Sequence, residues 1–123
     1  MKISKFTDLE VWKEAHKLTL LVYKITTSFP KAELYGLISQ LRRAAVSVES
    51  CIAEGFSRYH YKDRLRFYYD SRGSISEVQT QFLIAKDLKF VSKEEFDALW
   101  NQTEKVAIIL SGLIKSTEKL ANS

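Results

Sequence analysis

The sequence predicts an all-α fold, an antiparallel up-down four-helix bundle, from three observations. Residues that interrupt helices are rare, with one proline and four glycines among 123 residues. Apolar residues recur at spacings of three and four along four segments, which is the period of an amphipathic helix. The connections between these segments are short, so consecutive helices should pack side by side. A hydrophobic content of 46% over this length predicts a single globular domain, residues 1–123.

The first predicted helix begins at the segment T-D-L-E, where Thr7 can cap the helix and Glu10 can complete a capping box. It continues toward Phe29, and Pro30 closes it. Its apolar stripe consists of Leu9, Trp12, Ala15, Thr19, Val22 and Thr26.

The second predicted helix ends near residues 55–57, where glycine eases the exit from helical geometry. Its core stripe consists of Leu37, Leu41, Ala44, Val48 and Ile52. The third helix is expected to start around Tyr61 and to stop before the segment K-F-V-S, residues 89–92. Its buried positions are Tyr68, Ser71, Ile75, Val78, Phe82 and Ala85.

The fourth predicted helix opens at S-K-E-E, with Ser92 as the cap and Glu95 at the capping-box position. Its core positions are Phe96, Leu99, Thr103, Val106, Leu110 and Leu113. The tail T-E-K-L-A-N-S, residues 117–123, is expected to fray.

Two helices are apolar around more of their circumference than one bundle requires. The segments 18–23 and 106–110 are apolar most of the way round, and such helices are usually buried on more than one side. Leu20 and Ile108 are therefore candidate oligomer contacts. The alternative is that they are scattered exposed aliphatic residues, which are normal on protein surfaces.

A stripe of polar residues follows the second helix away from its apolar side. Helical spacing places Arg43, Ser47, Ser50 and Glu54 on this polar stripe. It is either a solvated face or a surface that a second helix covers, for which the two small serines leave room. Glu77, on the third-helix face that also carries Arg66, Asp70 and Gly73, is a candidate participant, and Gly73 would permit a close approach.

The segment 42–72 concentrates arginine and tyrosine. It contains all six arginines and four of the six tyrosines, and its seven cations face only four carboxylates. Arginine pairs with phosphate and stacks on bases, and tyrosine offers a flat face to unpaired bases, so this composition suits RNA or another single-stranded nucleic acid. The candidate nucleic-acid-binding residues are Arg42, Arg58, Tyr59, Lys62, Arg64 and Arg66. The same residue types are enriched at protein interfaces, and Asp63 and Asp70 could pair with some of the cations.

We expect no enzymatic activity, no catalytic residue, no metal ion and no cofactor. Cys51 has only His16 and His60 as possible bases, and neither spacing specifies a dyad or a metal site. Glu54 and Glu77 are more simply explained by ion pairing with nearby arginines. The single cysteine, the N-terminus without an apolar leader and the absence of a long apolar run predict a cytoplasmic protein that does not enter the membrane.

Five motifs together resemble a known family, the bacterial four-helix-bundle proteins associated with intervening sequences in large-subunit ribosomal RNA genes. The motifs are F-T-D-L-E-V-W (6–12), F-P-K-A-E-L-Y-G-L (29–37), Q-L-R-R-A-A-V-S (40–47), I-A-E-G-F (52–56) and G-S-I-S-E (73–77). The resemblance implies a homo-oligomeric ring, typically pentameric, with a basic surface and a largely unestablished role. A similar fold occurs in accessory proteins of diversity-generating retroelements, whose basic pentamers bind nucleic acid and a reverse transcriptase.

The chain departs from this pattern at two positions. Cys51 stands where the family commonly has asparagine, so polar contacts that the amide makes elsewhere are replaced by those of a thiol. Glu49 stands where the family commonly has proline, which keeps the helix intact. The function predicted from residues and resemblance is a non-enzymatic oligomeric scaffold or adaptor that binds nucleic acid. The alternative is a protein-interaction ring, such as an accessory subunit of a partner enzyme, with no role in nucleic-acid binding.

Overall fold

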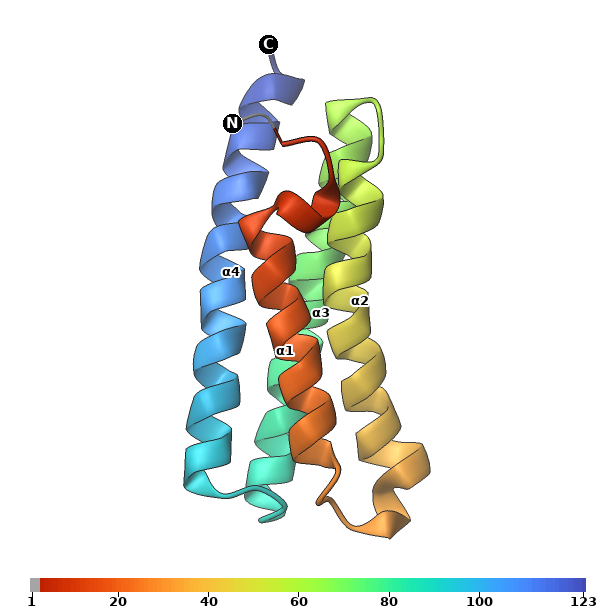
Figure 1. The fold of residues 1–123 in the computed structure, drawn as a ribbon, viewed down its shortest axis with the longest axis vertical. Helices are drawn as coiled ribbons and strands as arrows, with labels where there is room; N and C mark the ends of the chain where they lie inside the picture. Colours follow the sequence, from red (N-terminus) through yellow and green to blue (C-terminus); the bar gives the residue numbers. More distant parts are fainter. Residues whose placement is uncertain (1–2) are drawn as a thin grey trace.

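The computed structural model describes residues 3–123, and within that range the chain forms four α-helices and no strand (Figure 1). The helices are α1 (Glu10–Thr26), α2 (Ser39–Phe56), α3 (Tyr61–Asp87) and α4 (Lys93–Ala121). Consecutive helices run in opposite directions along one long bundle in Figure 1. The prediction of four helices in one bundle is confirmed.

The helical period correctly predicts the core. Of the positions assigned to the four apolar stripes, all are buried except Leu9, Trp12 and Leu113, which are half-buried. Each helix contributes fully buried aliphatic side chains to one continuous cluster, such as Leu18, Leu41, Val78 and Leu110. This burial is the main stabilising contribution, because each such side chain is worth about 1.5–3 kcal/mol when removed from water.

Buried hydroxyl groups add specific contacts between helices. The Thr19 hydroxyl lies 3.2 Å from the carbonyl of Ala15 in its own helix and 3.1 Å from that of Ala45 in α2. The Ser71 hydroxyl donates to the carbonyl of Val48 across the α2–α3 contact, at 2.8 Å. Each hydroxyl is thereby satisfied where water does not reach, which removes the cost of burying it.

Gly55 is the glycine that allows α2 and α3 to approach closely. A Cβ atom at this position would lie 2.7 Å from Cε1 of Tyr68 and 3.0 Å from Cβ of Phe67. Gly73 lies on the exposed side of α3, and a Cβ there would meet nothing within 4 Å among the described residues. Gly73 is therefore not needed for close packing within the bundle, and the close approach of a covering helix at Gly73 stays a prediction.

The helix ends agree with the sequence in part. The capping box of α4 is confirmed, because the Glu95 amide donates to the Ser92 hydroxyl at 3.1 Å and the Ser92 amide donates to the Glu95 carboxylate at 2.9 Å. The predicted Thr7 cap is wrong, because residues Phe6–Asp8 form a 3-10 turn and Leu9 precedes α1 without a side-chain cap.

The predicted fraying of the tail is also wrong. The last helix continues to Ala121, and Thr117 is buried in its final turns. The hydroxyl of Tyr69 donates a 2.6 Å hydrogen bond to the Glu118 carboxylate, which ties the end of α4 to α3. Packing against α3 therefore keeps the tail helical, although its local sequence predicted fraying.

A buried carboxylate joins α1 to α4. The side-chain amide of Gln102 donates to the carbonyl of Glu14 at 2.8 Å and to its carboxylate at 3.1 Å. The ammonium groups of Lys17 and Lys105 lie 3.2 and 3.3 Å from the same carboxylate. The hydrogen bond from Gln102, followed by those from the two lysines, lowers the pKa of Glu14 from 4.5 to about 2.

Between residues 3 and 123, no helix is both long enough and apolar enough to cross a membrane.

Candidate functional site

Most of the predicted nucleic-acid-binding residues gather at one end of the bundle. The turn between α2 and α3 lies at the end where the C-terminus of α4 lies (Figure 1). Residues 60–63 of this turn and of the first turn of α3 line a shallow surface pocket together with Leu120 and Ala121. We call the group Arg58, Tyr59, Lys62, Arg64 and Arg66 the basic end. The Tyr59 side chain is the most open aromatic group there, at 83% exposed.

Aromatic rings hold the arginines of the basic end in place. The guanidinium of Arg58 lies 4.6 Å and that of Arg66 lies 5.0 Å from the ring centre of Phe67. Arg64 lies 5.1 Å from the Phe56 ring, and its Nε donates to the carbonyl of Arg58 at 2.8 Å. A guanidinium that stacks on a ring through its face keeps N–H groups at its edge for a phosphate. Each of these three arginines therefore has an aromatic contact as well as N–H groups that can face a ligand.

No arginine is neutralised by a carboxylate within residues 3–123. The ion pairs in that range are those of Glu14 with two lysines and of Asp97 with Lys93, and the Glu49 carboxylate contacts the His16 ring. The predicted pairing of Asp63 and Asp70 with neighbouring cations does not occur. The positive charge of the basic end consequently remains available for an anionic partner.

Arg42 is not part of the basic end, although the sequence grouped it there. It lies in the first turn of α2, about 21 Å from the end of that helix at about 1.5 Å per residue. Its Nε donates to the Thr26 hydroxyl at 3.0 Å, and its guanidinium lies 4.6 Å from the ring centre of Tyr23. Arg42 is close to the basic end in the sequence but not in space, because most of the length of α2 lies between them.

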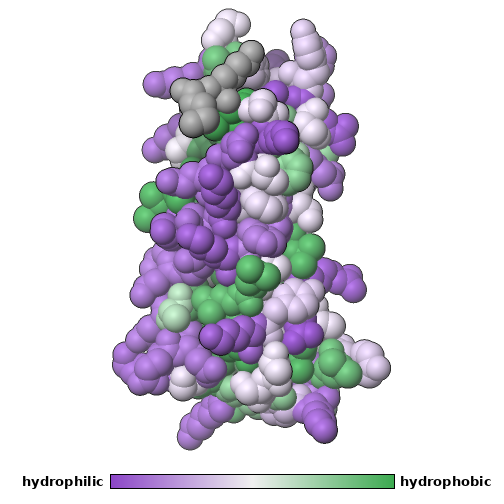
Figure 2. All heavy atoms as spheres, viewed as in Figure 1, coloured by the Kyte–Doolittle hydropathy of each residue, from purple (hydrophilic) through white to green (hydrophobic). Residues whose placement is uncertain are grey.

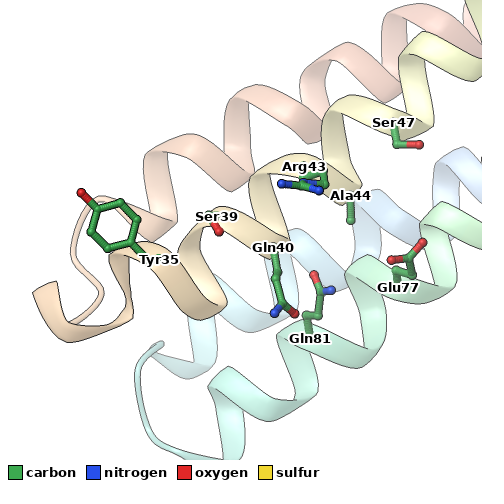
Figure 3. A pocket seen from close by; sticks show the side chains of 8 residues that line it. All are labelled: Tyr35, Ser39, Gln40, Arg43, Ala44, Ser47, Glu77 and Gln81. Carbon is green, nitrogen blue, oxygen red and sulfur yellow. The ribbon is translucent and has the colours of Figure 1, made fainter.

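Part of the polar stripe forms one wall of a groove between α2 and α3. Arg43 and Ser47 line this groove together with Glu77 of α3, and its volume is about 480 Å³ (Figure 3). We call it the α2–α3 groove; its other lining residues are Tyr35, Ser39, Gln40, Ala44 and Gln81. The hydroxyl of Ser47 is also 2.9 Å from that of Ser74. Ser50 and Glu54 lie further along α2 and do not line the groove.

Sequence reasoning missed the two glutamines of the α2–α3 groove. Gln81 follows Glu77 by four positions and Gln40 precedes Arg43 by three, so helical spacing places each on the same face as its charged neighbour. This helical spacing is the feature of the sequence from which the two glutamines could have been predicted. Which residues of α2 face which residues of α3 depends on the tertiary contact and is not encoded in either helix alone.

The Cys51 thiol and the His16 imidazole belong to different contacts. Cys51 is half-buried, its sulfur lies 3.7 Å from the Ser47 hydroxyl, and burial raises the pKa of the thiol. His16 packs flat on Trp12, with ring centres 4.9 Å apart, and its Nδ1 lies 3.0 Å from the Glu49 carboxylate. Glu49, a departure from the family pattern, thus joins α2 to α1. Within residues 3–123, no group of three or more histidine, cysteine or acidic residues is arranged to hold a metal ion.

The predicted oligomer contacts are both on the surface. Leu20 of α1 is 58% exposed and Ile108 of α4 is 73% exposed. Tyr23, Leu34 and Val46 are further exposed apolar side chains of the α1–α2 side. Figure 2 shows hydrophobic side chains among the polar ones on the face that contains α1.

These features define a class of protein, an all-helical bundle with an arginine-rich, aromatic surface at one end. The sequence profile of the family described as 23S rRNA-intervening sequence protein matches residues 7–112. The chain belongs to this family, and the resemblance seen in its motifs is confirmed.

The fold is similar to that of solved structures, of which one is described by its family. It is a protein of unknown function from the S23 ribosomal protein family of Bacteroides thetaiotaomicron, with a TM-score of 0.77 and 14% sequence identity. The alignment covers 85% of this chain and 98% of that chain. No curated protein matches the chain.

Proposed function

We propose that this protein is a non-enzymatic oligomeric scaffold or adaptor that binds RNA or other single-stranded nucleic acid through the basic end. The observation that carries the proposal is the set of contacts made by Arg58, Arg64 and Arg66. All three stack on aromatic rings, and none is paired with a carboxylate within the described residues. An arginine that rests against a ring but is not neutralised is suited to contact a phosphate.

The aromatic residues favour a single strand over a duplex. Tyr59 is exposed at the tip of the turn, next to the ring of His60, which lies 5.0 Å away. An unpaired base can stack on such a ring, whereas the bases of a duplex are already stacked on each other. The family's association with intervening sequences of 23S rRNA supports an RNA ligand.

In this proposal the antiparallel bundle assembles into a pentameric ring in the cytoplasm. Leu20 and Ile108 are exposed apolar residues that contacts between subunits would cover. A ring repeats the basic end once per subunit, so one strand that reaches several subunits binds more tightly than one patch alone allows.

Fluorescence anisotropy with labelled RNA tests this function. We expect the parent protein to bind a single-stranded probe more tightly than a duplex of the same length. Tyr59→Ala should weaken binding to the single strand by roughly 1–3 kcal/mol, because one stacking contact is lost. Tyr23→Ala is the matched control, since Tyr23 is an exposed tyrosine of α1 that lies outside both the basic end and the α2–α3 groove. A parent protein that binds neither probe contradicts the proposal.

The second candidate is a protein-interaction ring without a role in nucleic-acid binding. The exposed Leu20 and Ile108 favour it, because apolar residues contribute to protein interfaces but not to phosphate contacts. Such a ring should purify free of nucleic acid and leave the mobility of an RNA probe unchanged at every salt concentration.

A further inference from the structure

A second groove lies between the end of α1 and the start of α2, at the opposite end of the bundle from the basic end (Figure 1). It consists of two hollows with volumes of about 520 and 350 Å³. Leu34, Ile38 and Arg42 line both hollows, so the two form one continuous surface. We call this surface the α1–α2 groove.

Much of the lining of the α1–α2 groove is apolar. Phe29 and Ile38 are buried and form the deeper part, whereas Leu34 and Val46 are 48% and 39% exposed. Ile38, Arg42 and Val46 follow one another at intervals of four residues, so they form one stripe about 12 Å long. Contiguous apolar side chains that remain open to solvent are typical of an interaction site.

The charged residues of the α1–α2 groove are all cations. Lys31, Arg42 and Arg43 line it, and no carboxylate does so in the part of the chain that the structure describes. The Nε of Arg42 donates to the Thr26 hydroxyl at 3.0 Å, which leaves the N–H groups at the end of the guanidinium for a ligand. Two parallel N–H groups match the two oxygens of a carboxylate. A ligand that complements this groove therefore combines apolar and acidic groups.

We infer that the α1–α2 groove binds an acidic amphipathic helix of a partner protein. Apolar side chains of that helix lie against Leu34, Ile38 and Val46, and its carboxylates face Arg42 and Arg43. Two turns of a helix present apolar residues at positions i, i+3, i+4 and i+7, over a length close to that of the stripe. The inference does not depend on RNA binding at the basic end. It gives the proposed adaptor a protein partner at its other end.

Other occupants match the groove less well. The phosphates of RNA would lie against the aliphatic side chains of Leu34, Ile38 and Val46, which cannot replace their water. A small carboxylic acid would cover only part of a stripe about 12 Å long. The contacts proposed for a second copy of this chain, Leu20 and Ile108, do not line the groove.

Fluorescence anisotropy with a synthetic peptide tests the inference. The probe is a labelled helical peptide with leucine at positions i, i+3, i+4 and i+7 and glutamate at its other positions. We expect this peptide to bind. The same peptide with glutamine in place of glutamate should bind at least roughly 10-fold more weakly, because no carboxylate pairs with the arginines. Unlabelled single-stranded RNA should not displace the glutamate peptide.

Matched variants locate the binding surface. Leu34→Ser and Arg42→Gln should each weaken peptide binding at least roughly 10-fold while the helical circular dichroism stays the same. The controls are Leu88→Ser and Arg72→Gln, which should bind the peptide as the parent does. Leu88 is 54% exposed and the Arg72 guanidinium lies 5.1 Å from the Tyr69 ring centre, and neither residue lines the groove.

The double variant Arg58→Ala, Arg64→Ala should also keep peptide binding, which distinguishes the α1–α2 groove from the proposed RNA surface. Absence of peptide binding, equal binding of the glutamate and glutamine peptides, or binding that survives both Leu34→Ser and Arg42→Gln would overturn the inference. Displacement of the peptide by RNA would overturn it by assigning the groove to nucleic acid. A lower oligomeric mass of Leu34→Ser would overturn it by assigning the groove to a subunit contact.

Discussion

Glu14 shows how single residues determine part of the stability of this bundle. Its carboxylate is buried between α1 and α4 and accepts hydrogen bonds from Gln102, Lys17 and Lys105. These contacts favour the charged form, so the pKa in the folded protein is about 2 against 4.5 for an unperturbed carboxyl. A lowered pKa contributes stability that is fully present above pH 4.5 and is lost as the pH falls toward 2.

Glu14→Gln should therefore lower the free energy of unfolding by about 1–3 kcal/mol at pH 7, because charge-assisted hydrogen bonds become weaker. It should also flatten the loss of stability between pH 4.5 and 2 that the parent shows. Urea unfolding at several pH values measures both effects. Glu10→Gln, at an exposed position of the same helix, is the control. Identical pH profiles for the parent and Glu14→Gln would contradict the role assigned to Glu14.

At the scale of helices, the periodic features were predictable and the contacts between helices were not. The spacing of apolar residues identified the buried faces, and the pair Ser92 and Glu95 identified the start of α4, because both signals lie within one helix. The positions of the two glutamines in the α2–α3 groove depend on how α2 packs on α3. The separation of Arg42 from the basic end follows from the straight course of α2. Sequence proximity did not reveal either feature.

The two α-helical glycines in and near the α2–α3 contact should respond in opposite ways to the same substitution. Gly55→Ala should destabilise the protein by about 1–3 kcal/mol, because the added Cβ would lie 2.7 Å from the Tyr68 ring. Gly73→Ala should stabilise it by roughly 0.5–1 kcal/mol, because Gly73 is exposed in mid-helix and a Cβ meets open space. Chemical denaturation of both variants measures the difference, and the reverse order would contradict the packing described for α2 and α3.

At the scale of the whole molecule, the exposed apolar residues predict assembly. Light scattering coupled to gel filtration should report a mass several times the 14.2 kDa of one chain. Ile108→Glu should reduce that mass while leaving the helical circular dichroism unchanged, because it places a charge at a subunit contact and not in the core. Leu88→Glu is the matched control, since Leu88 is also an exposed aliphatic residue, at the other end of α3 from the basic end. A monomer at micromolar concentration would rule out the ring.

The central claim is that the basic end binds the phosphates of a nucleic acid. Its most direct test is the salt dependence of RNA affinity, measured for the parent and for the double variant Arg58→Ala, Arg64→Ala. Each phosphate contact releases counterions, so the logarithm of affinity should fall linearly with the logarithm of salt concentration. The double variant should bind all sequences more weakly, with a slope smaller by about one unit for each lost contact. Equal affinities and equal slopes for the two proteins would contradict the claim and assign the arginines to a protein contact.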